Sequence, residues 1–331
     1  MLVVTGGSGF IGSNLVALLE ESTQEPLVVC DDFDCTDKWR NLSQRRLYDI
    51  IPPIMLFDFL EENQSNITTV FHLGAISSTT ERNVDLVLEQ NFRFSKRLLQ
   101  WCSLNRVRLI YASSAATYGN GANGFNDSWK LDDLRQFLPL NPYAWSKHLF
   151  DLTLAQIHEG YAEDIMLPPQ IVGLKFFNVY GPNEYHKSGQ MSLVPQFFKQ
   201  INETGAIKLF KSTVPQFGHG EQKRDFIHVD DCAKVMLWFH QHPELSGLFN
   251  TGTGQARSFN DLATAVFKAM SRDTNIIYVD MPESLQSQYQ SFTQANMEKL
   301  TQIGYSQPFL SLEEGVESYV KNYLAKENPY R

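Results

Sequence analysis

The sequence predicts an α/β fold in which a doubly wound parallel sheet is joined to a smaller C-terminal α/β lobe. Three observations favour this class. Short apolar runs at residues 2–5, 27–30, 69–73 and 107–112 alternate with longer segments of helical period. The first run leads into a glycine-rich turn. The second ends in two acidic residues, about twenty positions past the glycines, as a dinucleotide-binding unit requires.

The composition limits the class of protein. The chain has 331 residues, of which 43% are hydrophobic and 20% charged, enough for two domains or one domain with an appended lobe. The net charge of −9 and the absence of a basic patch argue against a nucleic-acid partner. No apolar run is long enough to span a membrane, and the first strand leaves no room for a signal peptide. We therefore expect a cytoplasmic homo-oligomer with no membrane partner.

The cysteines give no sign of a metal or disulfide site. Cys30, Cys35, Cys102 and Cys232 form no C-x-x-C pair, and no histidines lie at zinc-ligand spacing. We expect no metal and four reduced, structural thiols. A redox-active pair of Cys30 and Cys35 is the alternative.

The glycine-rich turn predicts a dinucleotide site. Residues 5–12 read Thr-Gly-Gly-Ser-Gly-Phe-Ile-Gly and stand between the first strand and a helical segment. In this Rossmann-like context, backbone N–H groups and the positive end of the helix dipole can approach a pyrophosphate. The candidate cofactor residues of this turn are Gly6, Gly9, Phe10, Ile11 and Gly12.

The charges after the second strand leave the cofactor open. A carboxylate of Asp31 or Asp32 can accept a hydrogen bond from a ribose 2′-hydroxyl and would repel a 2′-phosphate, which favours NAD. Lys38 and Arg40 follow closely and could pair with that phosphate, so NADP remains open. The alternative is that both are solvated loop charges.

A second cofactor segment follows the strand at residues 69–73. The small residues after it let a cofactor approach closely. We expect His72, inside an apolar strand, to be a structural core residue. Asn91, in a helix predicted over residues 85–102, could reach this loop or cap a local carbonyl. The candidate cofactor residues here are Leu73, Gly74, Ala75, Ile76 and Ser77.

A helix that begins just before Tyr143 carries the candidate reactive groups. Asn141 is a good N-cap residue, and the proline after it suits the first helical position. Tyr143 and Lys147 lie four residues apart and so share a helix face, where the ammonium would favour the phenolate. Ser114 ends the preceding strand, where open parallel sheets place ligands. Alone, a tyrosine and lysine at this spacing are more often ordinary helix residues.

In this order, the glycine turn, Ser114 and Tyr143-x-x-x-Lys147 resemble the extended short-chain dehydrogenase/reductases that remodel nucleotide-activated sugars. The resemblance covers essentially the whole chain. Within that superfamily the chain is most similar to the ADP-L-glycero-D-manno-heptose 6-epimerases, and the pair His186–Lys187 after an Asn-x-Tyr-Gly-Pro turn is the sharpest motif. The other motifs lie at residues 77–81, 113–119, 223–226 and 289–294.

The resemblance implies an NADP-dependent epimerase that inverts C6 of a heptose by transient oxidation to a ketone, for lipopolysaccharide inner-core supply. Inversion benefits from two acid/base groups, because one base could not lie beside the hydroxyl in both configurations. The resemblance assigns these roles to Tyr143 and Lys187, with Ser114 orienting the oxygen and Lys147 tuning Tyr143. It adds Asn91, Tyr143, Lys147, Val179 and Lys187 to the cofactor contacts, and Ser114, Asn178, Gln196, Phe210, Lys211, Ser212, Arg224 and Tyr289 to the substrate contacts.

Arg224 is suited to a bidentate grip on a diphosphate, and an ion pair with Asp225 is the alternative. The turn Thr251 to Gly254 lacks a complete dinucleotide fingerprint, so we interpret it as a plain turn. In the heptose epimerases a glycine commonly follows the His-Lys pair, whereas here Ser188 does.

The expected boundaries are a cofactor domain of residues 1–177 with about 225–252, and a substrate lobe of residues 178–224 with 253–331. Two other functions fit parts of the pattern. A UDP-sugar 4-epimerase would share Tyr143 but would not need Lys187. A non-catalytic NADP-binding scaffold should have lost Tyr143 or its lysine partner.

Overall fold

The computed structural model describes residues 1–33, 36–162, 165–213, 216–282 and 291–331. The chain divides into two compact units. Unit 1 comprises Met1–Phe176 and Ala233–Asn250, and unit 2 comprises Phe177–Cys232 and Thr251–Arg331. In the described ranges no helix has the length and apolar character that a membrane crossing needs.

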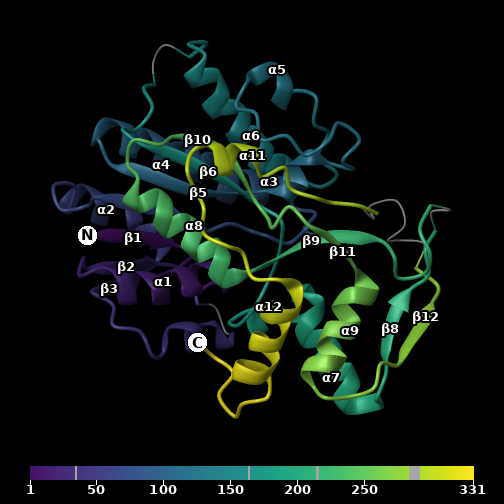
Figure 1. Cartoon of the computed structure of the whole chain (residues 1–331). Coiled ribbons are helices and arrows are strands. Elements are labelled where there is room, and N and C mark those ends of the chain that lie inside the picture. Colours follow the sequence, from purple (N-terminus) through teal and green to yellow (C-terminus); the bar gives the residue numbers. More distant parts are fainter. Residues whose placement is uncertain (34–35, 163–164, 214–215, 283–290) are drawn as a thin grey trace. The chain divides into compact units, whose positions relative to one another are not determined.

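Unit 1 is built on a sheet of seven strands in the order β10-β6-β5-β4-β1-β2-β3 (Figure 1). Every neighbouring pair from β6 to β3 runs parallel, and β1 pairs with both β2 and β4. The doubly wound parallel sheet predicted from the sequence is thereby confirmed. The strands are β1 (Leu2–Thr5), β2 (Leu27–Cys30), β3 (Asp49–Ile51), β4 (Thr69–His72), β5 (Arg108–Ser114), β6 (Ile171–Phe176) and β10 (Gly247–Thr251).

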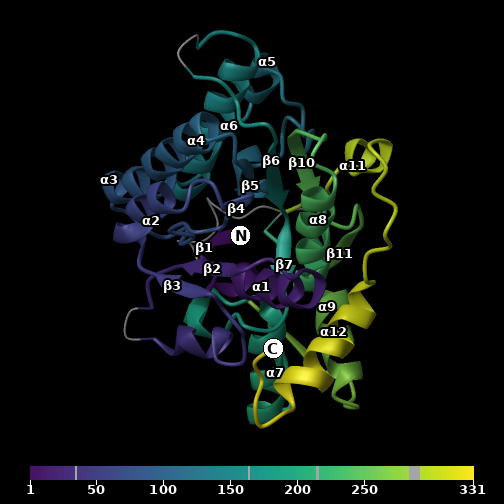
Figure 2. The same ribbon diagram turned by 90° about the vertical axis from the view of Figure 1, so that its left-hand side faces the viewer.

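Helices cover both faces of this sheet, so its strands are continuous apolar runs rather than alternating ones. Figure 2 shows α2, α3, α4 and α6 on one side of the strands and α1 and α8 on the other. All residues of β1, β2, β4 and β6 are buried. The helical segments are α1 (Phe10–Ser22), η1 (Asp37–Leu42), η2 (Pro53–Met55), α2 (Leu56–Glu62), α3 (Val84–Val87), η3 (Leu88–Arg93), α4 (Phe94–Leu104), η4 (Ala115–Tyr118), α5 (Leu131–Leu134), α6 (Pro142–His158) and α8 (Val229–Gln241).

The helix predicted over residues 85–102 is present but is not one regular helix. It is divided by the π-helical turn η3, which separates α3 from α4. Turns of this kind are frequent at functional sites, because the extra residue changes where the side chains point. Asn91 lies in η3, and its side chain binds the loop after β4.

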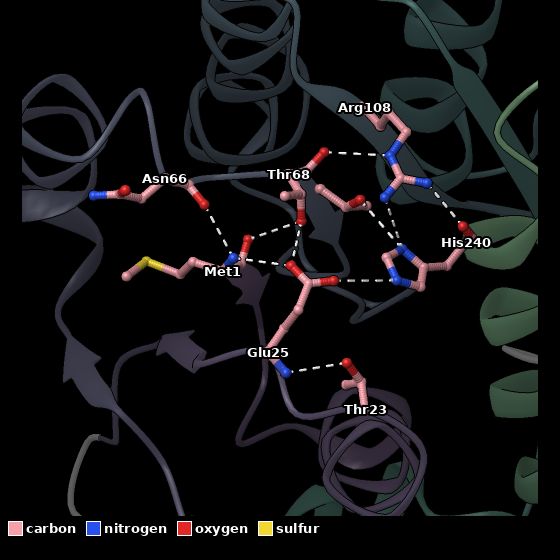
Figure 3. Close-up of polar contacts among 8 residues, drawn as sticks. Met1, Thr23, Glu25, Asn66, Thr68, Arg108 and His240 are labelled. Atoms are coloured by element: carbon pink, nitrogen blue, oxygen red, sulfur yellow. Dashed lines mark hydrogen bonds and ion pairs between the residues drawn. The ribbon is translucent and has the colours of Figure 1, made fainter.

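A polar cluster ties the N-terminal ends of the strands together (Figure 3). The Met1 ammonium donates to Glu25 at 2.9 Å, and the Thr68 hydroxyl donates to the same carboxylate at 2.6 Å. Arg108 donates to the His240 carbonyl at 2.7 Å, and the His240 ring lies 3.6 Å from Glu25. Because the strands run parallel, their N-terminal ends meet at one end of the sheet. The cluster lies at that end, and the glycine turn lies at the other.

Three of the cysteines are buried and free, as expected for structural thiols: Cys30, Cys102 and Cys232. Burial raises the pKa of the Cys30 thiol to about 12, with Asp31 and Asp32 adding to the effect. A thiol with so high a pKa is a poor nucleophile at neutral pH. Cys35 lies outside the described residues.

Unit 2 has a three-stranded sheet in the order β11-β9-β7 and a two-stranded sheet of β12 and β8. Its core is apolar and includes Phe197, Phe267 and Tyr319. β9 pairs with both β7 and β11, and residues 225–232 belong to this unit. The elements are β7 (Asn178–Tyr180), η5 (Tyr185–Gln190), α7 (Leu193–Thr204), β8 (Ile207–Phe210), β9 (Lys223–His228), β11 (Ala256–Ser258), α9 (Phe259–Ala269), β12 (Ile276–Val279), α11 (Glu298–Gln302), α12 (Leu312–Tyr319) and η6 (Val320–Leu324).

Candidate functional site

The glycine turn between β1 and α1 can be built only from glycine at two positions. Gly6 has φ +68°, and a Cβ there would lie 2.5 Å from the Gly74 nitrogen. A Cβ on Gly12 would lie 2.1 Å from the Gly6 carbonyl oxygen. The turn therefore packs directly against the loop after β4. Gly9 is the N-cap of α1 and offers no side-chain acceptor, so a phosphate fits at this helix N-terminus.

Asp31, at the end of β2, is engaged by the chain itself. One carboxylate oxygen accepts from the Ser8 amide at 2.8 Å and from its hydroxyl at 2.7 Å. The other accepts from the Lys38 ammonium at 2.5 Å and from the Asp32 amide at 2.9 Å. Asp31 thus braces the glycine turn, and Lys38 offsets its charge. Arg40, the other candidate cation, is half-exposed and lies 3.8 Å from Asp37.

A hydrogen-bonded chain leads from the glycine turn to the π turn. The Gly74 amide donates to the Thr5 hydroxyl at 3.2 Å, which lies 2.7 Å from His72 Nδ1. His72 Nε2 lies 2.8 Å from the Ser95 hydroxyl, which donates to the Asn91 carbonyl. Since that hydroxyl donates onward, it must accept from Nε2–H, and Nδ1 must accept from Thr5. Burial, with the Lys147 charge, lowers the pKa of His72 to about 3, which keeps this tautomer neutral.

The Asn91 side chain continues this connection to α6. It accepts from the Ile76 amide at 2.8 Å and donates to the Ile76 carbonyl at 3.0 Å. Its amide also donates to the Ser146 hydroxyl at 3.0 Å, and that hydroxyl donates to the Tyr143 carbonyl at 2.7 Å. Asn91 therefore does reach the loop after β4, and it joins that loop to the helix that carries Tyr143.

The start of α6 is as predicted. The Asn141 side chain accepts from the Ala144 amide at 2.9 Å, and proline occupies the first helical position. The Ser114 side chain is close enough to Tyr143 to lower the pKa of its phenol. Ser114, Tyr143 and Lys147 are thus held on two adjoining elements of unit 1, β5 and α6.

The pKa values of Tyr143 and Lys147, both on α6, are shifted in opposite directions. Burial raises the pKa of Tyr143, the Ser114 hydrogen bond lowers it and Asp151 raises it, and the result lies above the ordinary value. Burial is the largest of these effects, and the lowering of the pKa that we expected from Lys147 is not found. Burial also lowers the pKa of Lys147 to about 8, although Asp151 opposes this. The two pKa values therefore lie further apart than those of an ordinary tyrosine and lysine, and Tyr143 is the weaker acid of the two.

In unit 2, Lys187 lies in the short turn η5. Burial lowers the pKa of its ammonium, and Glu184 partly opposes the shift. Glu184 is itself buried and accepts from the Ser192 hydroxyl at 2.7 Å. Ser188 follows with φ +49° and ψ −122°, a conformation that favours glycine. The serine that departs from the resembled motif therefore occupies a glycine-like position.

Asn178 and Arg224 lie on neighbouring strands of unit 2, β7 and β9, and Val179 follows Asn178. The Asn178 amide donates to the Asp225 carbonyl at 3.2 Å. The Arg224 guanidinium donates to the carbonyl of the preceding residue and stacks over Phe259, 5.5 Å from the ring centroid. Both side chains are held in place by their own unit.

The Asp225 carboxylate accepts hydrogen bonds from the glycine turn that follows β10. It accepts from the amides of Thr253 at 2.7 Å, Gly254 at 2.9 Å and Ala295 at 2.9 Å. This carboxylate fills the turn from within the chain, which agrees with the plain turn we inferred for residues 251–254. These backbone amides satisfy the Asp225 carboxylate as a hydrogen-bond acceptor, so it does not require an ion pair with Arg224.

The remaining candidates of unit 2 are spread over α7 and β8. The Gln196 amide donates to the Met191 carbonyl at 2.8 Å. Lys211 follows Phe210 and pairs with Asp280 at 3.0 Å. The Ser212 amide donates to His219 at 3.2 Å. Tyr289 lies outside the described residues.

Sequence reasoning missed two charged residues of unit 1, Asp151 and Lys175. Both are fully buried and form an ion pair. A lysine inside the apolar run of residues 171–176 is a signal that could have been noticed, because an unpaired buried charge is prohibitively costly. Asp151 also stands eight residues after Tyr143, on the same face of the predicted helix.

Comparisons with known proteins identify the family. The sequence profile of the NAD dependent epimerase/dehydratase family matches residues 2–252. The ADP-L-glycero-D-manno-heptose-6-epimerases of Nitratidesulfovibrio vulgaris (strain DP4) and Fusobacterium nucleatum are 46% and 43% identical to this chain. Each match covers 100% of this chain and 100% of the relative.

Two solved structures have the same fold. The ADP-L-glycero-D-manno-heptose-6-epimerase of Helicobacter pylori matches with a TM-score of 0.78 and 27% identity over 97% of this chain and 95% of that one. A UDP-N-acetylglucosamine 4-epimerase from Methanobrevibacter ruminantium matches with a TM-score of 0.78 and 25% identity over 97% of this chain and 98% of its own. With its glycine turn and its Ser114–Tyr143–Lys147 arrangement, the chain belongs to the NAD dependent epimerase/dehydratase family.

Proposed function

We propose that this chain is an NADP-dependent isomerase that inverts C6 of the heptose in ADP-D-glycero-D-manno-heptose. The observation that carries the proposal is Lys187, a partly buried lysine of lowered pKa, in a chain that also has the Ser114, Tyr143 and Lys147 arrangement. An ordinary dehydrogenase or 4-epimerase of this superfamily has no need of a second base. The full-length similarity to proteins named as heptose 6-epimerases supports the same substrate.

The residues of unit 1 fit a nicotinamide dinucleotide. A Cβ at Gly6 or Gly12 would collide with backbone atoms of the chain itself, so this close turn requires glycine, and the N-terminus of α1 suits a pyrophosphate. When bound, the cofactor supplies a group that takes a hydride from the substrate carbon and returns it. We favour NADP because Lys38 neutralises Asp31, whose charge would otherwise repel a 2′-phosphate.

The residues that would hold the cofactor, beyond the glycine turn, are Asp31, Asp32, Lys38, residues 73–77, Asn91, Tyr143, Lys147, Val179 and Lys187. Lys147 would bind the nicotinamide ribose as well as tune Tyr143. The backbone of residues 73–77 is fixed by Asn91 through Ile76, which supports a pre-formed cofactor loop.

The proton transfers are assigned to two side chains because the hydroxyl on C6 changes its direction during inversion. Tyr143 serves one configuration and Lys187 the other. The side chain beside the substrate hydroxyl takes its proton when the alcohol is oxidised. The other side chain gives a proton to the oxygen when the ketone is reduced. Ser114 holds the substrate oxygen. The lowered pKa of Lys187 favours the neutral amine, which is the form that a base requires.

Substrate binding is assigned to residues of unit 2. Arg224 would grip the diphosphate, because its guanidinium is already oriented by the Phe259 ring. The other proposed contacts are Asn178, Gln196, Phe210, Lys211, Ser212 and Tyr289. This activity would supply heptose for the lipopolysaccharide inner core, in the cytoplasm and as a homo-oligomer.

The test is incubation of the purified protein with ADP-D-glycero-D-manno-heptose and, separately, with UDP-galactose, with product stereochemistry followed by NMR. We expect inversion at C6 of the heptose only. Tyr143→Phe and Lys187→Met should each lose most of the turnover, whereas Lys199→Met, at an exposed lysine of α7, should retain it. Turnover of the UDP-sugar alone refutes the substrate, and full activity of Lys187→Met refutes the second base.

A further inference from the structure

Two opposite charges are completely buried beneath the face of α6 that carries Tyr143 and Lys147. Asp151 lies one helical turn past Lys147 and two past Tyr143, so the three side chains share a face. Its carboxylate is 2.8 Å from the ammonium of Lys175, on β6. Neither side chain of this pair is exposed to solvent.

The pair is fully satisfied by neighbouring groups of unit 1. Asp151 accepts from the Tyr111 hydroxyl at 2.8 Å and the Ser113 hydroxyl at 2.7 Å. Lys175 donates to the Thr117 hydroxyl at 2.6 Å and lies 4.8 Å from the centroid of the Tyr118 ring. The network therefore joins four elements: β5, the turn η4, β6 and α6.

Stability alone does not account for this pair. A buried ion pair pays a large desolvation cost, and apolar replacements of similar volume are often as stable or more stable. The elements that it joins are those that carry the proposed reactive groups. Ser113 precedes Ser114, Thr117 follows it in the next turn, and Asp151 stands on the same helix as Tyr143.

We propose that Asp151 and Lys175 are positioning residues, which hold Ser114 in register with the Tyr143–Lys147 face of α6 while Lys175 cancels the negative charge that Asp151 presents to Tyr143. This inference rests on the roles proposed above for Ser114, Tyr143 and Lys147. Neither Asp151 nor Lys175 needs to touch a ligand to act in this way.

The electrostatic surroundings explain why both partners are needed. Asp151 raises the pKa of Lys147, which keeps that ammonium charged, but it raises the pKa of Tyr143 as well. In the proposal Lys175 offsets the second effect, because its ammonium lies 2.8 Å from the Asp151 carboxylate. The titratable groups that face the pair are Tyr111 from β5, Tyr118 from η4, and Tyr143, Lys147 and His148 from α6, with Asp127 beside Tyr118.

The experiment measures the titration of Tyr143 by NMR, with isotope-labelled tyrosine in the NADP-loaded protein and Tyr143→Phe to assign the signal. Lys175→Met should move the Tyr143 midpoint upward by about one pH unit, because an uncompensated charge then lies about 12 Å along the helix. Lys175→Arg keeps the cation and should stay near the wild-type midpoint. Lys199→Met is the matched control at an exposed site and should shift nothing.

An unmoved Tyr143 midpoint in folded Lys175→Met protein overturns the proposal. If that variant does not fold, the double variant Asp151→Asn/Lys175→Met, which leaves no buried charge, provides the test. Lys147 then loses its neighbouring carboxylate, so its midpoint should fall below about 8. An unchanged Lys147 midpoint overturns the proposal too. These titrations do not depend on turnover, so a failure to epimerise the heptose would refute the proposed function separately.

Discussion

We expect Lys38 to decide whether the end of β2 accepts a 2′-phosphate, and its replacement by alanine tests the proposed choice of NADP. Its ammonium lies 2.5 Å from Asp31, and only 18% of its side chain is exposed. Removing it loses a charge-assisted hydrogen bond to the phosphate, worth roughly 1.5–3 kcal/mol. Without Lys38 the negative charge of Asp31 is also no longer neutralised. It would repel a phosphate about 6 Å away by roughly 3 kcal/mol at an effective dielectric constant of about 20.

We therefore expect Lys38→Ala to weaken NADP binding by about 1,000-fold or more, since the two contributions together reach roughly 4.5–6 kcal/mol and each 1.4 kcal/mol is about a factor of ten. NAD binding should be unchanged or tighter, because one Asp31 oxygen becomes available to a ribose hydroxyl. Calorimetric titration of wild type and variant with each dinucleotide measures both affinities.

Two further variants make this experiment specific. Lys38→Arg keeps the positive charge and should retain a preference for NADP. Arg40→Ala removes a cation from the same short helix, but Arg40 is half-exposed and only 3.8 Å from Asp37, so both affinities should change less than about threefold. If Lys38→Ala binds NADP within about threefold of wild type, the phosphate is held elsewhere and the reasoning is wrong.

Three smaller changes test the local structure by urea unfolding. Ser188→Gly should raise the free energy of unfolding by about 1 kcal/mol, because glycine tolerates φ +49° without strain; a loss of stability would contradict this. Asn141→Ala should cost about 1 kcal/mol by removing the cap of α6, and Asn141→Ser should recover most of it. Burial alone would raise the pKa of Glu25, but hydrogen bonds from Thr68 and the Met1 ammonium hold it below its usual 4.5. The ionised carboxylate therefore stabilises the fold above that pH and loses this advantage as the pH falls. The stability gap between wild type and Glu25→Gln should narrow on going from about pH 7 to about pH 3, and a constant gap would refute the role of Glu25.

Most of the secondary structure of unit 1 could be predicted because its signals are local. The strands at Leu2–Thr5 and Leu27–Cys30 end where their apolar runs end, and α6 begins where an N-cap asparagine precedes a proline. The helix expected over residues 85–102 was only partly correct. Its π turn contains Asn91, whose side chain is hydrogen-bonded to the loop after β4. Helical periodicity in the sequence does not indicate such a long-range contact.

The sequence by itself determined which groups the proposed site has. The glycine turn, the acidic end of β2, and the spacing of Tyr143 and Lys147 are short-range patterns, and backbone geometry converts them directly into a turn, a strand end and a helix face.

Only the tertiary structure decided the partners of these groups. Asp31 bonds the Ser8 hydroxyl, His72 joins Thr5 to Ser95, and Lys175 pairs with Asp151. The physical reason is that each such contact joins residues far apart along the chain, from 23 to 67 positions in these cases. No local period records which strand end meets which helix, so the protonation and charge of the site appear only once the sheet is assembled.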